Sequence, residues 1–279
     1  MKNMKIIKPG IIVMFLTITI IFTYNWYQDK KGIDKTYPEI QIGPEQIDVS
    51  VKAEEKELLQ DVIAKDAKDG DLTNSIVIES ISKFVDKENH ICNITYAVAD
   101  SDNNVTKKTR RIRYTDYEPP KFTLSQPLCF DIGSDIRVTD VIGAVDDYDG
   151  DISSKVKILS STVRTDTAGE YTITAQVTNS LGDTAKFKAT VVIRQRNNLS
   201  PVISLKKNIV YLKKGDDFSP EKYIDSVKAY NEDSISEDKV EVVSSSVDIK
   251  KAGCYSVEYM VKDSQNNEGN TYLTVVVED

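Results

Sequence analysis

Cysteine, histidine and tryptophan are scarce in this 279-residue chain, which has three, one and one of them. A Ser-His-Asp or Cys-His catalytic set could be assembled only around His90, and we interpret that residue as structural. The cysteines, Cys92, Cys129 and Cys254, fall in three different predicted domains, so each is expected to be a small buried hydrophobe rather than half of a disulfide. Zinc-ligand spacings, phosphate loops and dinucleotide fingerprints are absent as well. The sequence therefore predicts a protein that is not an enzyme.

Clustered positive charge is also rare. The net charge is −8, and the only dense basic run comprises Lys107, Lys108, Arg110, Arg111 and Arg113. Carboxylates elsewhere in the same repeat oppose this run, so we interpret it as a solvated strand face rather than a polyanion site. Nucleic acid is not an expected partner, because phosphate binding needs a clustered basic surface.

The chain has one long hydrophobic run, at its N-terminus. Residues 11–27 follow Lys2, Lys5 and Lys8 and carry no charge, and a run of this length is close to what a membrane-spanning helix needs. The preceding lysines predict a single-pass signal anchor with a short cytoplasmic tail, residues 1–10, and with everything after a linker at 28–36 outside the cell. A cleaved signal peptide is the alternative, although no small-x-small cleavage site follows the run.

The remainder of the chain is a threefold repeat. Each copy opens on a proline followed by alternating apolar residues, at Pro38, Pro120 and Pro201, with spacings of 82 and 81 residues. Each copy closes on a strand of period-two alternation that starts at Cys92, Tyr171 and Tyr255, at offsets of 79 and 84 residues. A polar turn and a returning strand follow every time; the turns are 100–104, 179–183 and 263–267.

These repeats predict an all-β fold of three tandem β-sandwiches, because each copy of about 80 residues holds about seven short strands separated by turn signals. The predicted domains are domain 1 at 37–118, domain 2 at 119–196 and domain 3 at 197–279. Helical character is confined to 54–65, and its counterparts near 138–145 and 220–229 predict at most one short helix or bent strand in each copy. Short proline-bearing linkers predict that the domains form an extended rod.

An acidic turn in the middle of the first two copies is the one motif with potential chemistry. It contains Asp-Gly-Asp and brings several carboxylates together, as a Ca²⁺ site requires, although the spacing differs from that of an EF-hand loop. The candidate calcium ligands are Asp66, Asp69 and Asp71 in the first copy and Asp147, Asp149 and Asp151 in the second. Asp-Gly also builds tight turns without metal, and the third copy, from Asn231, lacks the glycine. A structural turn without any cofactor is therefore the alternative to calcium.

Together these motifs resemble the bacterial Ig-like surface repeat that occurs in pesticidal crystal proteins and Gram-positive cell-surface proteins. The second copy carries the resemblance best, through Asp149-Gly150-Asp151, Gly169-Glu-Tyr171 and the turn from Asn179. In the first copy, His90-Ile-Cys92 replaces the Gly-x-Tyr start of the closing strand. The resemblance covers roughly residues 37–279 and implies immunoglobulin-like sandwiches at the cell surface, but no activity.

Binding is the function class that the sequence favours. Loops at the ends of sandwiches and free edge strands are common recognition surfaces, so we expect the ectodomain to mediate adhesion to an unidentified protein or polysaccharide of the envelope or the surroundings. A passive spacer, stiffened by calcium if the acidic turns bind it, is the alternative. No cargo domain or wall-sorting signal follows the third copy in this sequence, which favours the Ig-like domains as the working part.

Overall fold

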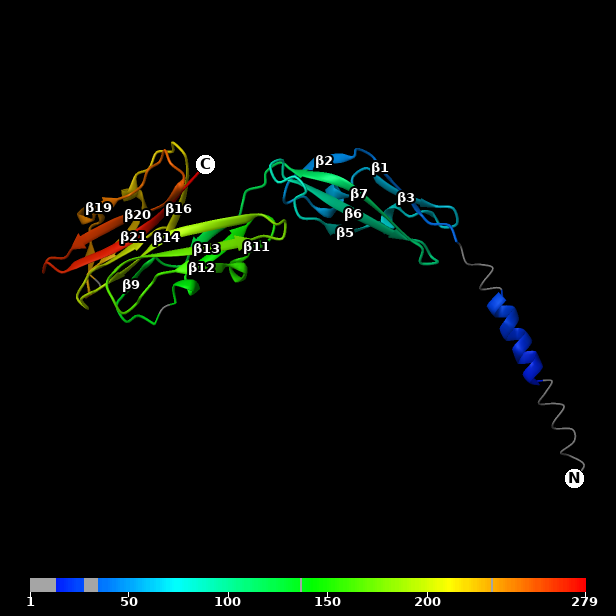
Figure 1. Ribbon diagram of the computed structural model, residues 1–279, viewed down its shortest axis with the longest axis horizontal. Helices are drawn as coiled ribbons and strands as arrows, with labels where there is room; N and C mark the ends of the chain where they lie inside the picture. The colour runs from blue at the N-terminus through cyan, green and yellow to red at the C-terminus, as the bar shows by residue number, and fades with distance from the viewer. Residues whose placement is uncertain (1–13, 28–34, 136, 232) are drawn as a thin grey trace, which may run out of the picture. The chain divides into compact units, whose positions relative to one another are not determined.

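The computed structural model describes residues 14–27, 35–135, 137–231 and 233–279 (Figure 1). Residues 14–27 are helical. Among the described residues, no helix combines the length and the apolar character needed to cross a bilayer. The predicted tail at 1–10, the first three residues of the predicted membrane segment and most of the predicted linker lie outside the described residues.

The body of the protein is all-β and consists of three pairs of sheets, one pair for each repeat (Figure 1). In domain 1 the smaller sheet has the order β1-β3-β4 and the larger the order β2-β7-β6-β5. The strands of domain 1 are β1 Glu39–Ile42, β2 Gln46–Val49, β3 Val62–Asp66, β4 Gly70–Asp71, β5 Val77–Ile81, β6 Ile91–Ala99 and β7 Val105–Tyr114. Short helical turns are α2 Glu55–Leu58 and η1 Thr73–Ser75.

Domains 2 and 3 repeat this topology. Their smaller sheets are β11-β10-β8 and β15-β17-β18, and their larger sheets are β12-β13-β14-β9 and β16-β21-β20-β19. The elements of domain 2 are β8 Lys121–Leu124, β9 Cys129–Asp131, η2 Val138–Asp140, β10 Ile142–Asp146, β11 Gly150–Asp151, η3 Ser153–Lys155, β12 Lys157–Ser161, β13 Gly169–Thr178 and β14 Thr184–Arg194. Those of domain 3 are β15 Val202–Leu205, β16 Ile209–Lys213, η4 Pro220–Tyr223, β17 Ile224–Lys228, β18 Ser234–Ile235, η5 Glu237–Lys239, β19 Glu241–Ser245, β20 Gly253–Lys262 and β21 Glu268–Glu278.

The closing hairpin supplies the largest share of each core. In β13 the side chains of Ile173, Ala175 and Val177 are buried while their neighbours in sequence are more exposed, as the period-two pattern predicts. The partner strand β14 contributes Phe187 and Val191 to the same cluster. Strand alternation in the sequence thus places one face of each hairpin between the two sheets, where apolar burial stabilises the sandwich.

The segment at 54–65 contains one short helix, as expected, but its second half is a strand. Only α2, a single turn, is helical; Glu54 and Glu57 form a capping box at its start, and Leu58 points into the core. From Val62 the chain is strand β3, which pairs with β1 through contacts such as Val62 with Ile42. The β-branched residues Val62 and Ile63 favour a strand, and β1 offers an edge with which this strand pairs. These two effects override the helical spacing of the preceding residues.

Domains 2 and 3 pack against each other and form one compact unit, while domain 1 up to Arg113 belongs to a second unit. Ile209, Cys254 and Val276 of domain 3 contact the apolar core of domain 2. The Tyr211 hydroxyl accepts a hydrogen bond from the amide of Phe122 at 2.7 Å and donates to the carbonyl of the same residue at 3.1 Å. This contact runs along strands, β14 beside β20, so the predicted end-to-end rod is wrong for this pair of domains.

The outer face of the larger sheet in domain 3 explains this packing. Tyr211 and Val276 occupy the positions that Asp48 and Arg113 occupy in domain 1, as judged from the equivalent strand pairings. In domain 1 the two charged side chains form an ion pair in solvent. In domain 3 the apolar pair is removed from water by domain 2, which stabilises the contact through the hydrophobic effect.

Candidate functional site

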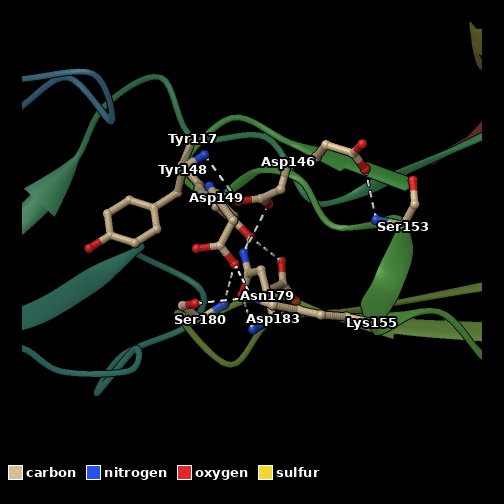
Figure 2. A network of polar contacts seen from close by, with 10 residues as sticks. Tyr117, Asp146, Tyr148, Asp149, Ser153, Lys155, Asn179, Ser180 and Asp183 are labelled. Carbon is tan, nitrogen blue, oxygen red and sulfur yellow. Dashed lines mark hydrogen bonds and ion pairs between the residues drawn. The ribbon is translucent and has the colours of Figure 1, made fainter. Parts of the chain in front are cut away.

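The acidic turn of domain 2 is held by hydrogen bonds from its own backbone (Figure 2). Oδ1 of Asp146 accepts from the amides of Tyr148 at 3.0 Å and Asp149 at 2.9 Å. Oδ1 of Asp151 accepts from the amide of Ser153 at 2.9 Å, and hydrogen bonding from the side chain of Ser153, followed by its amide, lowers the pKa of Asp151. Between them Gly150 takes a positive φ of 74°, which lets the chain reverse. Domain 1 repeats this pattern, with Gly70 at the position of positive φ. The amides of Lys68 and Asp69 donate to Asp66, and the amide of Thr73 donates to Asp71.

The middle aspartate fastens the acidic turn to the turn of the closing hairpin. Oδ2 of Asp149 accepts from the amide of Ser180 at 2.7 Å and from Nζ of Lys155 at 2.8 Å. Burial alone would raise the pKa of Asp149, but these bonds outweigh it and the pKa is lowered. In domain 1, Asp69 binds the amide and hydroxyl of Ser101 in the same way. Each acidic turn is therefore a clasp between two loops at one end of its sandwich.

Beneath this clasp in domain 2 lies a buried polar cluster that the sequence did not reveal (Figure 2). Nδ2 of Asn179 donates to the hydroxyl of Tyr117 at 2.8 Å and to Oδ2 of Asp146 at 3.0 Å. The Tyr117 hydroxyl donates in turn to Oδ2 of Asp183 at 2.9 Å. Tyr117, in the segment before Pro119, is buried, and burial followed by the Asp183 contact raises its pKa. The cluster ties the segment just before domain 2 to both of the loops of that domain.

Domain 1 contains a less complete version of this cluster. Asp100 stands where domain 2 has Asn179 and has no side-chain amide to donate. As a result, the buried Oδ2 of Asp66 has no hydrogen-bond partner, whereas the equivalent oxygen of Asp146 binds Asn179. A buried oxygen without a partner costs free energy, so this turn is less stabilised than its counterpart.

The six predicted calcium ligands are divided between these roles. Five of them, Asp66, Asp69, Asp71, Asp149 and Asp151, accept the turn hydrogen bonds described above. Asp147 is exposed, and the buried aspartate equivalent to Asp66 is its neighbour Asp146. Within residues 14–27, 35–135, 137–231 and 233–279, no three Asp, Glu, His or Cys side chains are grouped as metal ligands. Calcium binding stays a prediction.

In domain 3 the clasp is replaced. Ala229 stands at the end of β17, where the other domains have a buried aspartate, and its amide bonds the carbonyl of Asp233 at 2.9 Å. Asn231 and Asp233 bond each other through their side chains. The hairpin turn is unchanged, since Oδ1 of Asp263 still accepts from the amides of Gln265 and Asn267. The fold therefore forms without the Asp-Gly-Asp sequence.

Replacing Gly150 with alanine is expected to destabilise domain 2 by about 1 kcal/mol. A Cβ at this position would have no atom within 4 Å, so the cost comes from the positive φ and not from a clash. Gly150→Asn should cost less, because asparagine adopts this conformation more readily. Hydrogen exchange of domain 2 peptides would measure both; equal effects of the two variants would contradict this explanation.

The remaining candidate groups are structural. His90 lies in the turn before β6 at a positive φ of 54°, and its ring packs against Phe84. All three cysteines are free thiols. Burial raises the pKa of Cys92 and Cys129 to about 11 and that of Cys254 to about 12, so the thiols stay protonated at neutral pH.

The basic run on β7 does not form one solvated face. Lys107 and Arg113 are exposed and form ion pairs with Glu79 and Asp48, as expected of a strand face. Arg110, by contrast, points inward and is 3% exposed. The interpretation of this run as wholly solvent-facing is therefore wrong at Arg110, because alternate residues of a strand face opposite sides.

Comparisons with known proteins agree with the repeat structure. Residues 122–193 and 205–277, just over half of the chain, match the family described as bacterial surface protein, Ig-like domain. The chain is also 29% identical over 225 residues to the pesticidal crystal protein Cry22Aa of Bacillus thuringiensis; the match covers 77% of this chain and 29% of that protein. The chain thus spans less than a third of the length of this relative.

Solved structures give weaker likenesses. The M60 catalytic domain with two CBM51 domains of Clostridium perfringens ZmpB is 16% identical, with a TM-score of 0.26, over 88% of this chain and 31% of that one. The lipoprotein BT2262 of Bacteroides thetaiotaomicron is 13% identical, with a TM-score of 0.23, over 57% and 80%. TM-scores this low carry no inference about function. The two matched segments coincide with the sandwiches of domains 2 and 3, and the chain belongs to the family of bacterial surface proteins with Ig-like domains.

Proposed function

We propose that this protein is a membrane-anchored, non-enzymatic surface protein whose Ig-like domains bind a partner in the envelope or outside the cell. The observation that supports binding best is the packing of domain 3 on domain 2. Tyr211 and its apolar neighbours join the two sandwiches into one unit, so their loops are held in fixed relative positions. A rigid scaffold that presents loops is a common basis for recognition, and a simple spacer needs no such contact.

The proposed anchor rests on the sequence. The uncharged residues 11–27 and the three lysines before them favour a single span with the N-terminus in the cytoplasm and the Ig-like domains outside. Membership of a family of bacterial surface proteins supports the same orientation. Fractionation of cells that express the full chain should place it in the membrane, and external protease should remove domains 1 to 3. Recovery in the culture medium, shortened at its N-terminus, would favour the cleaved signal peptide.

The absence of enzymatic activity is proposed from the use of the polar groups. The carboxylates that could act as a general acid or base, such as Asp146 and Asp149, are engaged in bonds that hold turns together. His90 is part of a turn beside an aromatic ring. Groups committed to structure in this way are poorly placed for proton transfer to a substrate.

A pull-down tests the binding proposal. The full chain, immobilised through a C-terminal tag, should enrich one specific component from solubilised envelope or from extracellular material. The same tagged chain after heat denaturation is the control for nonspecific capture. If the folded and denatured chains retain the same material, the spacer alternative is favoured instead.

Calcium addition tests the stiffened-spacer alternative. If the acidic turns bind the ion, millimolar calcium should raise the melting temperature relative to EDTA, and Asp149→Ala should abolish the rise. Because Asp149 already accepts bonds from Ser180 and Lys155, we expect the melting temperature to be the same in both buffers. A rise that Asp149→Ala removes would establish the calcium site and contradict this expectation.

A further inference from the structure

A groove of about 690 Å³ opens on domain 1 between the end of β1 and strand β7. Residues from the crossover to β2, from β6 and from β7 line it: Ile42, Gly43, Glu45, Gln46, Asn93, Lys108, Thr109, Arg110 and Arg111. The groove lies within one compact unit and is of the size that small ligands occupy. Its lining includes three cations and one acid, Glu45, in a protein whose net charge is −8.

Arg110 is the unusual member of this lining. Its Nε donates to the Tyr96 hydroxyl and its Nη2 to the carbonyl of Leu58, both at 2.7 Å. Its third nitrogen, Nη1, is buried and has no hydrogen-bond partner. No carboxylate is among these contacts, so the guanidinium is buried without a counter-charge, which is costly. Arg110 is part of the groove lining, so an anion bound there would lie close to this uncompensated charge.

The fold itself does not require this arginine. The strand pairings place Ala189 of domain 2 and Leu273 of domain 3 at the position of Arg110, and both are buried in their cores. The same pairings match Arg111 with Thr190 and Thr274. Two sister domains thus form the same sandwich with neutral residues at both positions, and the charges of domain 1 call for another explanation.

We propose that this groove binds a sugar that carries a carboxylate or phosphate group. Lys108 and Arg111, whose side chains are exposed, supply the positive charge for the acid, and Arg110 adds a buried charge beside them. The guanidinium of Arg111 suits the geometry of both anions. Asn93, Thr109 and Gln46 supply the amide and hydroxyl groups that recognise sugar hydroxyls. The inference rests on the proposed binding function and names the ligand class for one site of it.

Isothermal titration calorimetry on the full chain tests this assignment with two acidic sugars, a neutral sugar and an acidic peptide, hexaglutamate. Trigalacturonate and glucose 6-phosphate represent the carboxylate and phosphate forms, and maltotriose is the neutral control. We expect saturable binding of at least one acidic sugar, weakened by added salt, and no binding of maltotriose. Which acidic sugar binds more tightly identifies the source of the charge. If neither binds, or if hexaglutamate binds more tightly than both, the assignment to an acidic sugar is wrong.

Two groove variants and one matched control locate the site. Lys108→Gln with Arg111→Gln changes exposed side chains and should weaken binding about tenfold. The matched control is Lys186→Gln with Lys188→Gln on β14 of domain 2, which removes the same charge outside the groove and should change affinity less than about twofold. Arg110→Leu copies Leu273 and should abolish binding without loss of cooperative melting. Equal affinities of the groove pair and the control pair would overturn the proposal, even if Arg110→Leu failed to fold.

The same variants separate this inference from the binding function as a whole. If the Lys108→Gln, Arg111→Gln chain captures the same envelope component as the unmodified chain, and no acidic sugar binds, the groove proposal fails and the binding function stands. If acidic sugars bind in the groove but the pull-down is empty, the groove proposal stands and the envelope partner does not.

Discussion

Asp146→Ala should destabilise domain 2 by about 3 kcal/mol, whereas Asp147→Ala beside it should change stability by less than about 0.5 kcal/mol. The carboxylate of Asp146 is buried and accepts three hydrogen bonds, two from the turn and one from Asn179. Its removal leaves two amides and the buried Asn179 side chain without this acceptor. An unpaired buried donor costs more free energy than the net contribution of the hydrogen bond that it lost. Asp147 is exposed and serves no comparable role in the turn.

Hydrogen exchange of the full chain, resolved by peptide, measures this difference, because it reports the opening of domain 2 separately from that of domain 1. Asp66→Ala provides a second comparison. Its Oδ2 has no partner, so its removal should destabilise domain 1 by less than Asp146→Ala destabilises domain 2. Equal protection in Asp146→Ala and Asp147→Ala would show that the polar cluster contributes little.

The contrast between these neighbours illustrates what the sequence could predict. The Asp-Gly-Asp pattern located the turn correctly, because the glycine must adopt a positive φ and the flanking aspartates favour turns. It could not decide which of the adjacent aspartates, Asp146 or Asp147, faces inward. That depends on the register of β10 against β8, where a shift of one residue exchanges the two faces.

The buried arginine was missed for a related reason. Lys107 to Arg113 form a compact basic run, and the run as a whole looks solvated because charged residues are seldom buried. Alternation alone would place Arg110 on the face of Ile112 and Tyr114, which are core residues, so the signal was present but was outweighed by residue type. The Tyr117 cluster offered no such signal, since it joins segments more than 60 residues apart.

The rod prediction failed for domains 2 and 3 because linker composition says little about side-to-side contact. A proline-bearing linker restricts the chain locally, but the relative placement of domains 2 and 3 is set by the side chains on the outer sheet face, such as Tyr211 and Val276. In the sequence these residues lie inside unbroken apolar runs, 209–212 and 275–277, in which alternation does not show which side chains face the core. Only the pairing of β16 with β21 shows that they point away from the core of their own domain.

Tyr211→Ala is expected to uncouple domain 3 from domain 2. In the unmodified chain we expect the two domains to unfold together, because the opening of either exposes the apolar contacts of Ile209, Cys254 and Val276. Removal of the ring should weaken the interface by about 3 kcal/mol through lost burial and through the two bonds to Phe122. The unfolding of domain 3 should then separate from that of domain 2 in a thermal or urea transition.

Two further variants divide this effect into its parts. Tyr211→Phe keeps the ring and removes the hydroxyl, so it should cost about 1 to 2 kcal/mol and leave the transition single. Tyr230→Ala removes a 48% exposed ring of domain 3 away from these contacts and should change little. If Tyr211→Ala unfolds like Tyr230→Ala, in a single transition that is little changed, the Tyr211 ring does not couple the two domains. A split transition would mean that one aromatic side chain converts two surface modules into a single rigid body, and a scaffold of that kind can hold loops from two domains in register for a shared partner.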